Sequence, residues 1–459
     1  MILHACLRPS LRASLLAAAT LLCGCATYHA LPLGHGEGAA SAERLSVPAS
    51  TMPLPELASH RFDPADGLDV TEVAMLAVAN SPDLKVQRDA LGVARAQAFA
   101  AGLLPDPQLS FGEDFPQHSS DGSTTAYNLG ISADVSALLL RSTRKRAANA
   151  QAEQVNLDLL WAEWQTIAQA RLLFEQVQSL RAQQVGLDAE LRALAPVDQA
   201  VQAALHAGNL SYDGASAGLN AMADARQRAA DNAVALHQAE SDLRQLLGLA
   251  PTAPLDLVGA PYQVDPDVTQ LQAALADLPR RRPDLLALQA GYRAQEAQLR
   301  GAILAQFPAI TLGLDHARDN TGIKSSGFTI GITLPLFDRN RGNIAIEKAT
   351  RQQLKDDYEA RLLATRNDMQ RLAADLQTLD ARQATQVAHA QRLDAARDAA
   401  EQAWNKGLLD WPTYLSIRAN ALAADSDLLT LRQARATAAI ALEALLGRTD
   451  FVMQRMSKR

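Results

Sequence analysis

The spacing of apolar residues changes its period along the chain, and each change marks a predicted element. Over residues 71–102, apolar residues such as Val73, Leu76 and Leu84 recur at helical spacing, which predicts one helix with a buried face. The same spacing returns over residues 268–306. We therefore expect one helix of this kind in each half of the chain.

A second pattern alternates between apolar and polar residues, which is the period of a half-buried strand. The expected strands are residues 108–115, 127–135, 310–316 and 328–334. Loops containing Gly, Ser and Asp, around residues 119–123 and 320–326, separate the members of each pair. The sequence therefore predicts two hairpins, about residues 107–135 and 309–336, with strands near the roughly 9 to 11 residues that cross a bilayer at a tilt.

A long segment without turn signals follows each hairpin, at residues 146–193 and 344–405. At 1.5 Å per residue these helices would be roughly 70 Å and 90 Å long, and helices of such length without caps indicate a coiled coil. Gly208 and Gly407 come at matching places, where the chain is expected to turn. The helices that return from these turns are expected to end at Gly248 and Gly447.

The same order of elements is present twice, at an offset of about 200 residues, which is the mark of an internal repeat. Residues 81–84, Ser-Pro-Asp-Leu, return as residues 282–285, Arg-Pro-Asp-Leu. The expected divisions are a first repeat at 69–250, a connector at 251–268, a second repeat at 269–448 and a tail at 449–459.

The start of the chain has the layout of a bacterial secretory signal. Arg8 and Arg12 precede an apolar run over residues 15–22, which is too short for a membrane helix. The tetrad Leu-Cys-Gly-Cys that ends at Cys25 resembles a lipoprotein signal, in which a cysteine takes a diacylglyceryl group. The resemblance makes residues 1–24 the signal peptide and Cys25 the lipidated residue. An ordinary secretory signal with a stray cysteine is the alternative.

The region after this signal has no helical or strand period. Residues 25–68 are rich in Pro, Gly, Ser and His, and we expect them to form an extended linker that trails from the lipid. Cys6, Cys23 and Cys25 are the chain's three cysteines. A mature chain that starts at Cys25 would keep one cysteine, so folding cannot depend on an internal disulfide.

Composition narrows the class of protein. Aromatic residues make up 4% and apolar residues 48%, so the apolar share is mostly Ala and Leu, as in closely packed helices. The net charge of −7 excludes the basic footprint of a nucleic-acid-binding protein. Beyond the signal, no stretch approaches the roughly 18 to 20 unbroken apolar residues of a membrane helix. Any membrane crossing is therefore expected to use the strands.

Four strands cannot close a barrel, and unpaired strand edges are costly in lipid. Several copies must therefore combine, and three copies would supply twelve strands. The predicted fold class is mainly α with a small β part. The same three copies would bring their long helices together as a cylinder.

The order of helix, hairpin, long helix, glycine turn and helix, repeated twice, resembles the TolC-type outer membrane efflux family over essentially the whole mature chain. Residues 101–107 and 334–342 are most similar to its heavy-metal branch, typified by CzcC. The resemblance implies a homotrimer in a Gram-negative outer membrane, with a 12-stranded barrel and a coiled-coil helical barrel that extends into the periplasm. It implies a passive duct that works with a periplasmic adaptor and an inner-membrane pump, of RND type. The expected cargo is heavy-metal cations, or otherwise drugs or small molecules.

No motif in the sequence predicts catalysis. The nine histidines show no metal-site spacing, and phosphate-binding loops and nucleophile elbows are missing from the sequence. The chain is therefore predicted not to be an enzyme and to carry no cofactor beyond the covalent lipid on Cys25. A periplasmic coiled-coil lipoprotein, acting as an adaptor or scaffold, is the rival class, and the paired hairpins argue against it.

Two groups of residues are candidates for a functional site. The resemblance places the turns at Gly208 and Gly407 near the periplasmic tip, where an adaptor docks; plain helix-breaking glycines are the alternative. Asp394, Asp398 and Glu401 follow four-three spacing and share one helix face.

That acidic face has two readings. If it faces the lumen, the threefold assembly would form a ring of carboxylates at the pore entrance that attracts cations. If it faces outward, its members are ordinary solvated charges, with Arg397 placed to pair with Glu401.

Overall fold

The computed structural model describes residues 27–34, 36–48, 52–117, 123–259 and 271–446. The chain forms two compact units, Met1–Gly38 and Ala39–Arg459. The described part of the first unit is exposed and has no helix or strand. Several expected features lie outside the described residues: the signal peptide, Cys25, loop residues 118–122, connector residues 260–270, Gly447 and the tail.

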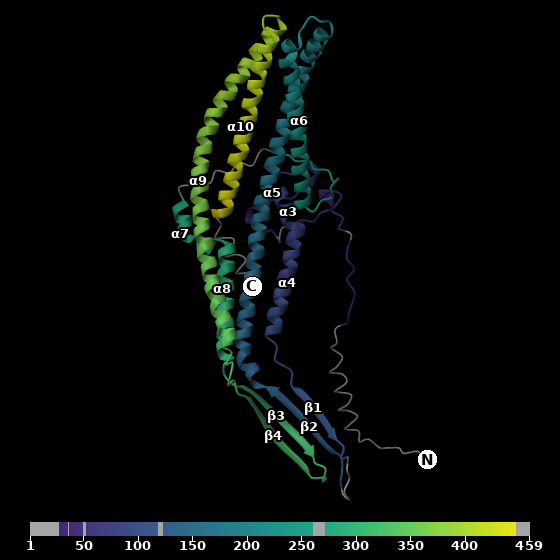
Figure 1. Cartoon of the computed structure of the whole chain (residues 1–459), viewed down its shortest axis with the longest axis vertical. Helices are drawn as coiled ribbons and strands as arrows, with labels where there is room; N and C mark the ends of the chain where they lie inside the picture. Colours follow the sequence, from purple (N-terminus) through teal and green to yellow (C-terminus); the bar gives the residue numbers. More distant parts are fainter. Residues whose placement is uncertain (1–26, 35, 49–51, 118–122, 260–270, 447–459) are drawn as a thin grey trace, which may run out of the picture. The chain divides into compact units, whose positions relative to one another are not determined.

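The second unit holds all the described helices and strands (Figure 1). In chain order they are η1 (Ala42–Arg44), α2 (Pro55–Ser59), η3 (Pro64–Asp66), α3 (Val70–Asn80), α4 (Pro82–Ala101), β1 (Gln108–Asp114), β2 (Ala126–Asp134), α5 (Val135–His206), α6 (Tyr212–Leu246), α7 (Leu271–Arg281), α8 (Pro283–Leu304), β3 (Ala309–Arg318), β4 (Lys324–Thr333), α9 (Arg341–Asn405) and α10 (Trp411–Leu446). The order from α3 to α6 returns from α7 to α10.

The helix before each hairpin is divided in two, so the prediction of one continuous helix over 71–102, and likewise over 268–306, is wrong. Ser81 has an extended backbone (φ −52°, ψ 125°), and Pro82 begins α4. In the second half, Arg282 is extended and Pro283 begins α8. A proline disfavours the helical conformation of the residue before it but fits the first turn of a new helix, so each break falls at an X-Pro step.

The long helices exceed or match their predicted bounds. Helix α9 has 65 residues, close to the expected 344–405. Helix α5 has 72 residues, about 108 Å at 1.5 Å per residue, and it begins directly after β2, where Asp134 caps it. The predicted end near residue 193 is wrong, because the helix continues through Pro196. The lost hydrogen bond is offset by packing, since Val197 and Val201 are buried.

One antiparallel sheet joins the two halves, in the order β1-β2-β3-β4. The central pair, β2 and β3, sets Ile131 opposite Leu314, so the two hairpins are locked in register by backbone hydrogen bonds. The outer strands β1 and β4 each have one edge with no partner strand among the described residues.

The two faces of the sheet differ in character because alternate side chains point to opposite faces. One face, here called the apolar face, carries large apolar side chains from all four strands. Its main members are Leu109, Phe111, Leu129, Ile131, Ile310, Leu312, Leu314, Phe328, Ile330 and Ile332, all exposed in the single chain. The opposite face carries small or polar residues, among them Thr311, Asp315 and Thr329, and the Thr329 hydroxyl donates to Asp315 at 2.7 Å.

The structure differs from the expected linker in residues 39–68, which fold into the second unit. Leu54, Leu57 and Leu68 are at most 3% exposed and join the core formed by α3, α5 and α6. Two isolated parallel β-bridges connect this segment to the chain after α6. They pair Ala39 with Leu249 and Leu68 with Leu257. The apolar residues of this segment are few and follow no helical or strand period, so the sequence pattern does not predict that they are buried. They are buried because other elements form a core against which they pack.

The three largest apolar cores of the described residues pack the helices together. The first, around Leu76 and Phe174, lies in the first half, and the second, around Leu278 and Met369, joins α7 and α8 to α9 and α10. The third contains side chains from α5, α6, α9 and α10 near the two helix turns, including Val201. The two repeats are therefore packed together at their turns within a single chain.

Candidate functional site

The two long helices end in turns of the same geometry. After α5, the amides of Gly208 and Asn209 donate to the carbonyls of Leu205 (3.0 Å) and Ala204 (2.9 Å). After α9, Gly407 and Leu408 repeat the arrangement on Trp404 and Ala403, at 2.8 and 2.9 Å. Both sets of bonds form a Schellman motif, which satisfies the last free carbonyls of a helix.

Glycine is needed at these turns because of the backbone conformation. Gly208 and Gly407 have φ of 72° and 69°, in the left-handed region where a side chain is costly. A Cβ atom added at either glycine would meet nothing within 4 Å, so the surroundings leave the site open. A role in adaptor docking stays a prediction for both residues.

The predicted acidic face lies on the last turns of α9, and a basic network contacts each member. Arg397 lies 2.7 Å from Asp394 and 3.5 Å from Asp398, and it also reaches Asp425 of α10 at 3.6 Å. Glu401 lies 3.5 Å from Arg418 of α10. The predicted pairing of Arg397 with Glu401 is therefore wrong, because the α9–α10 packing gives Glu401 a different arginine. The orientation of these carboxylates toward a lumen stays a prediction.

Arg418 is the centre of a buried ionic link between helices. Its guanidinium donates to Glu190 of α5 at 2.6 Å, and both side chains are at most 8% exposed. It also donates to the Tyr414 hydroxyl at 3.2 Å, and the Tyr414 ring stacks on Trp404 with centroids 5.2 Å apart. Burial by itself lowers the pKa of Arg418, but the hydrogen bond and charge of Glu190 outweigh it, and the pKa is raised. Arg418 therefore stays charged and ties α10 to α5 and α9.

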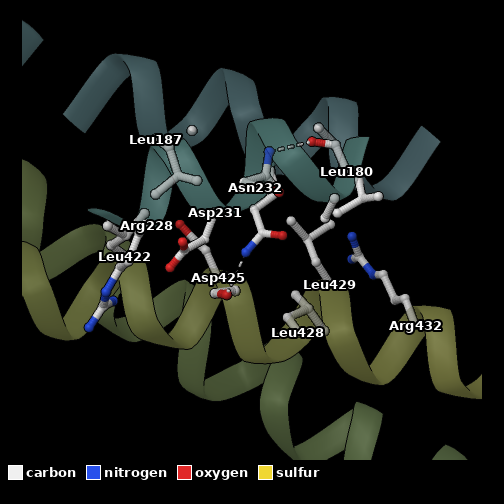
Figure 2. Close-up of a pocket in the computed structure, with 15 residues that line it drawn as sticks. Leu180, Leu187, Arg228, Asp231, Asn232, Leu422, Asp425, Leu428, Leu429 and Arg432 are labelled. Carbon is white, nitrogen blue, oxygen red and sulfur yellow. Dashed lines mark hydrogen bonds between the residues drawn. The ribbon is translucent and has the colours of Figure 1, made fainter. Parts of the chain in front are cut away.

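A cleft of about 670 Å³ lies among α5, α6 and α10 (Figure 2). In that view Arg228 and Arg432 lie at opposite ends, with Asp231 and Asp425 between them. Burial raises the pKa of Asp425, and the nearby charge of Asp394 raises it further, while two arginines oppose the shift. The cleft thus combines apolar walls with charges of both signs.

One polar atom in the cleft has no hydrogen-bond partner among the described residues. The amide nitrogen of Asn232 donates to Gln184 Oε1 at 2.8 Å and to the Leu180 carbonyl at 3.1 Å, as Figure 2 shows for Leu180. The Asn232 oxygen is buried and unpaired in the described chain. An unpaired buried acceptor costs free energy, so this oxygen is a place where a bound water or ligand donor would stabilise the structure.

Neither the Arg418 link nor the cleft is predicted from the sequence. The residues of the link are 228 positions apart, and the cleft draws on three helices from both halves. Polar residues inside an otherwise apolar helical stripe were the available signal, and Arg418 and Glu190 occupy such positions. A pairing over that distance follows only from the packed structure.

The described residues contain neither a candidate metal cluster nor a helix suited to span a membrane. Among the described residues, no group of three or more His, Cys, Asp or Glu side chains could hold a metal ion. None of the described helices combines the length and apolar character needed to cross a membrane. The lipidation proposed at Cys25 concerns a residue outside the described ones.

Comparisons with known proteins agree with this architecture. Residues 270–448 match the family described as "Outer membrane efflux protein". Protein CyaE of Bordetella pertussis is 28% identical over 73% of each chain, and the pyoverdine export outer membrane protein OpmQ of Pseudomonas putida is 25% identical over 83% of this chain and 86% of its own length. The structure of the CmeC outer membrane channel of Campylobacter jejuni matches with a TM-score of 0.71 at 14% identity, over 85% of this chain and 88% of that one. Residues 270–448 are thus similar to the outer membrane efflux protein family, and the two relatives extend this similarity over most of the chain.

Proposed function

We propose that this protein is the outer membrane channel of a tripartite efflux system, a passive trimeric duct that carries cargo across the outer membrane. The observation that carries the proposal is the four-stranded sheet, which has one apolar face, two open edges and a direct continuation into very long helices.

The edges of the sheet favour association of copies. Strands β1 and β4 present unpaired backbone groups, and such groups cannot remain unpaired in hydrocarbon, where each costs several kcal/mol. Pairing of β4 with β1 of the next copy removes the edges. Three copies then give a barrel of 12 strands, an even number within the range of membrane barrels.

The partners follow from the proposed role. A passive duct has no energy source, so an inner-membrane pump supplies the energy, and a periplasmic adaptor joins the two. We propose that the turns at Gly208 and Gly407 are the adaptor-facing end of the duct and that the pump is of RND type. We further propose that lipidation of Cys25 anchors the N-terminus of the mature chain to the outer membrane.

The cargo has two candidate classes. The printed names of the relatives include pyoverdine export and multidrug resistance, which favour small organic molecules. The sequence motifs at residues 101–107 and 334–342 favour heavy-metal cations. Growth of a deletion strain on graded concentrations of drugs and of zinc, cobalt and copper salts distinguishes the two, since sensitivity appears only for the cargo that the duct exports.

The membrane role of the sheet is tested by a matched pair of substitutions. Leu312 and Thr311 are neighbours on β3 but point to opposite faces, so Leu312→Arg and Thr311→Arg place the same charge at nearly the same depth. We expect Leu312→Arg to cost about 2 kcal/mol or more, because it puts a charge against lipid, and Thr311→Arg to cost much less.

The measurements are the yield of trimer extracted from outer membranes and the single-channel conductance in planar bilayers. The proposal predicts loss of trimer for Leu312→Arg and a conducting trimer with altered conductance for Thr311→Arg. Equal yields for the two variants, or a wild-type protein that is a stable monomer without detergent, would contradict the proposed function.

A further inference from the structure

The apolar face of the sheet ends in a band of polar and basic side chains where the hairpins turn. We call this the outer band; it consists of Tyr127, His316, Arg318 and Lys324. Register pairs Tyr127 with Arg318 and Arg318 with Lys324, so these three residues form one row across β2, β3 and β4. His316 is two residues from Arg318 and therefore points to the same face as Leu314.

The side chains of the outer band are held in place by contacts with one another and with backbone. The Nη2 and Nε atoms of Arg318 donate to the Thr125 carbonyl at 2.7 and 3.2 Å, and its guanidinium lies 5.5 Å from the Tyr127 ring centroid. His316 bonds the Ser326 hydroxyl at 2.8 Å. Arg318 retains further N–H donors, and Lys324 is exposed with no ion pair among the described residues. The band therefore presents two cations with unused donors.

Basic residues also lie at the opposite end of the sheet. Arg144 and Lys145 follow β2 on α5, and Arg339 and Arg341 follow β4; all four are exposed. Large apolar residues lie between the two basic regions, and Phe337 at 89% exposed is the last of them. The apolar face is thus bounded by positive charge at both ends.

The length of the strands that carry the apolar face fits a membrane. From Lys324 to Thr333 the strand spans about 30 Å, at 3.3 Å per residue. A tilt of about 35–45° reduces this to roughly 21–25 Å along the membrane normal, close to the apolar band of about 25 Å in membrane barrels. The outer band then lies at the level of the lipid headgroups on the side remote from the helices.

We propose that the outer band binds the phosphate groups of anionic lipids, with Arg318 and Lys324 as the phosphate-binding residues and the adjoining apolar face in contact with the acyl chains. The proposal rests on the proposed insertion of the sheet in the outer membrane. A lipid fits better than a free phosphate, because the cations adjoin a continuous apolar surface that a free ion would leave in water.

The nearest negative charge on the same face also has to be considered. Glu113 of β1 lies opposite Tyr127 in the register, and in a closed barrel the β1 edge of the next copy would approach Lys324. A bridge from Lys324 to the next copy's Glu113 is therefore the competing use of this lysine. If this bridge forms, Lys324 should stabilise the trimer equally whether or not lipid phosphate is present.

The test uses the full-length trimer in phosphatidylcholine nanodiscs that contain either lipid A with two phosphates or its monophosphoryl form. Native mass spectrometry measures the glycolipid molecules retained per trimer, and the trimer melting midpoint is measured in the same discs. The test variant is Arg318→Gln/Lys324→Gln. The control is Lys355→Gln/Arg366→Gln, which removes the same charges from exposed positions on α9.

We expect lipid A to bind more tightly than its monophosphoryl form to the wild type. Each removed charge should weaken lipid A binding about fivefold, so the double variant should bind about 25-fold more weakly. The control should bind as the wild type does, and Arg318→Lys/Lys324→Arg, which keeps the charge, should retain most of the binding.

Two results would overturn the proposal. One is unchanged retention of lipid A in Arg318→Gln/Lys324→Gln. The other is an equal loss of melting temperature in discs with lipid A and in discs with its monophosphoryl form, which would assign the residues to contacts between copies. Conductance of the wild type in planar bilayers is measured separately, so failure of the channel function is distinguishable from failure of lipid binding.

Discussion

The buried link between Arg418 and Glu190 provides a quantitative test of how the helix turns are held together. Glu190→Gln keeps the size of the side chain but removes the charge that faces the Arg418 guanidinium at 2.6 Å. Both residues are at most 8% exposed, so water cannot take the place of the lost carboxylate. The variant therefore leaves a buried cation without its main partner.

The cost of this change follows from the remaining contacts. Breaking a buried ion pair by removing one partner costs about 3–5 kcal/mol. Arg418 keeps the Tyr414 hydroxyl at 3.2 Å and the Glu401 carboxylate at 3.5 Å, so we expect a value near the lower end, about 3 kcal/mol. Replacement of both residues, Glu190→Met/Arg418→Met, removes the buried charge as well, and we expect it to lie within about 1 kcal/mol of the wild type.

The assay is thermal dissociation and unfolding of the detergent-extracted trimer, followed by far-UV circular dichroism and by the fraction of trimer on size-exclusion chromatography. Midpoints are compared between variants, because a large membrane oligomer does not unfold in two states. Glu359→Gln is the matched control, since Glu359 forms an exposed pair with Lys355 at 3.6 Å. Exposed pairs contribute about 0–1 kcal/mol, so this control should change the midpoint little.

The order of midpoints decides the outcome. We expect similar melting midpoints for the wild type, Glu359→Gln and the double methionine variant. The midpoint of Glu190→Gln should be well below these three. If Glu190→Gln melts together with Glu359→Gln, the link does not stabilise the turns, and the reasoning from burial is refuted.

Three further predictions concern the turns, the entrance and the anchor. Gly407→Ala should destabilise the turn by about 1–2 kcal/mol, because φ of 69° is strained for a residue with a Cβ atom; trimer melting measures it. Asp394→Asn, Asp398→Asn and Glu401→Gln should each lower cation selectivity in planar bilayers if these carboxylates line the lumen, and unchanged selectivity in all three removes that role. Cys25→Ala should abolish lipid labelling yet leave some trimer, and mass spectrometry of an unmodified mature N-terminus would exclude lipidation.

Gly186→Ala is the control for the glycine substitution. Gly186 lies inside α5, and a Cβ atom there would meet nothing within 4 Å. Alanine at this helical position should leave stability unchanged or raise it by about 0.4–1 kcal/mol. If Gly186→Ala lowered the stability of the trimer as much as Gly407→Ala, the left-handed backbone would not be the cause of the destabilisation.

The sequence by itself determined the features that depend on local rules. The change from helical spacing to alternation located the four strands, because side-chain direction follows the backbone period in every strand and helix. Gly208 and Gly407 could be placed at the turns, since the left-handed conformation is accessible mainly to glycine. Alternation also gave the two faces of the sheet before any pairing was known.

Only the tertiary structure decided the features that depend on contacts between distant residues. Helix α5 passes Pro196 because packing of its neighbours outweighs one lost hydrogen bond, and residues 39–68 fold because a core is present to receive Leu57. The arginine partner of Glu401 was mispredicted, since helix spacing offered Arg397 while the packing of α10 supplied Arg418. Which residues form an ion pair between two helices depends on how the helices are rotated and shifted against each other. The strength of the pair depends on how deeply it is buried. The residue pattern within one helix gives neither the relative position of the helices nor the burial of the pair.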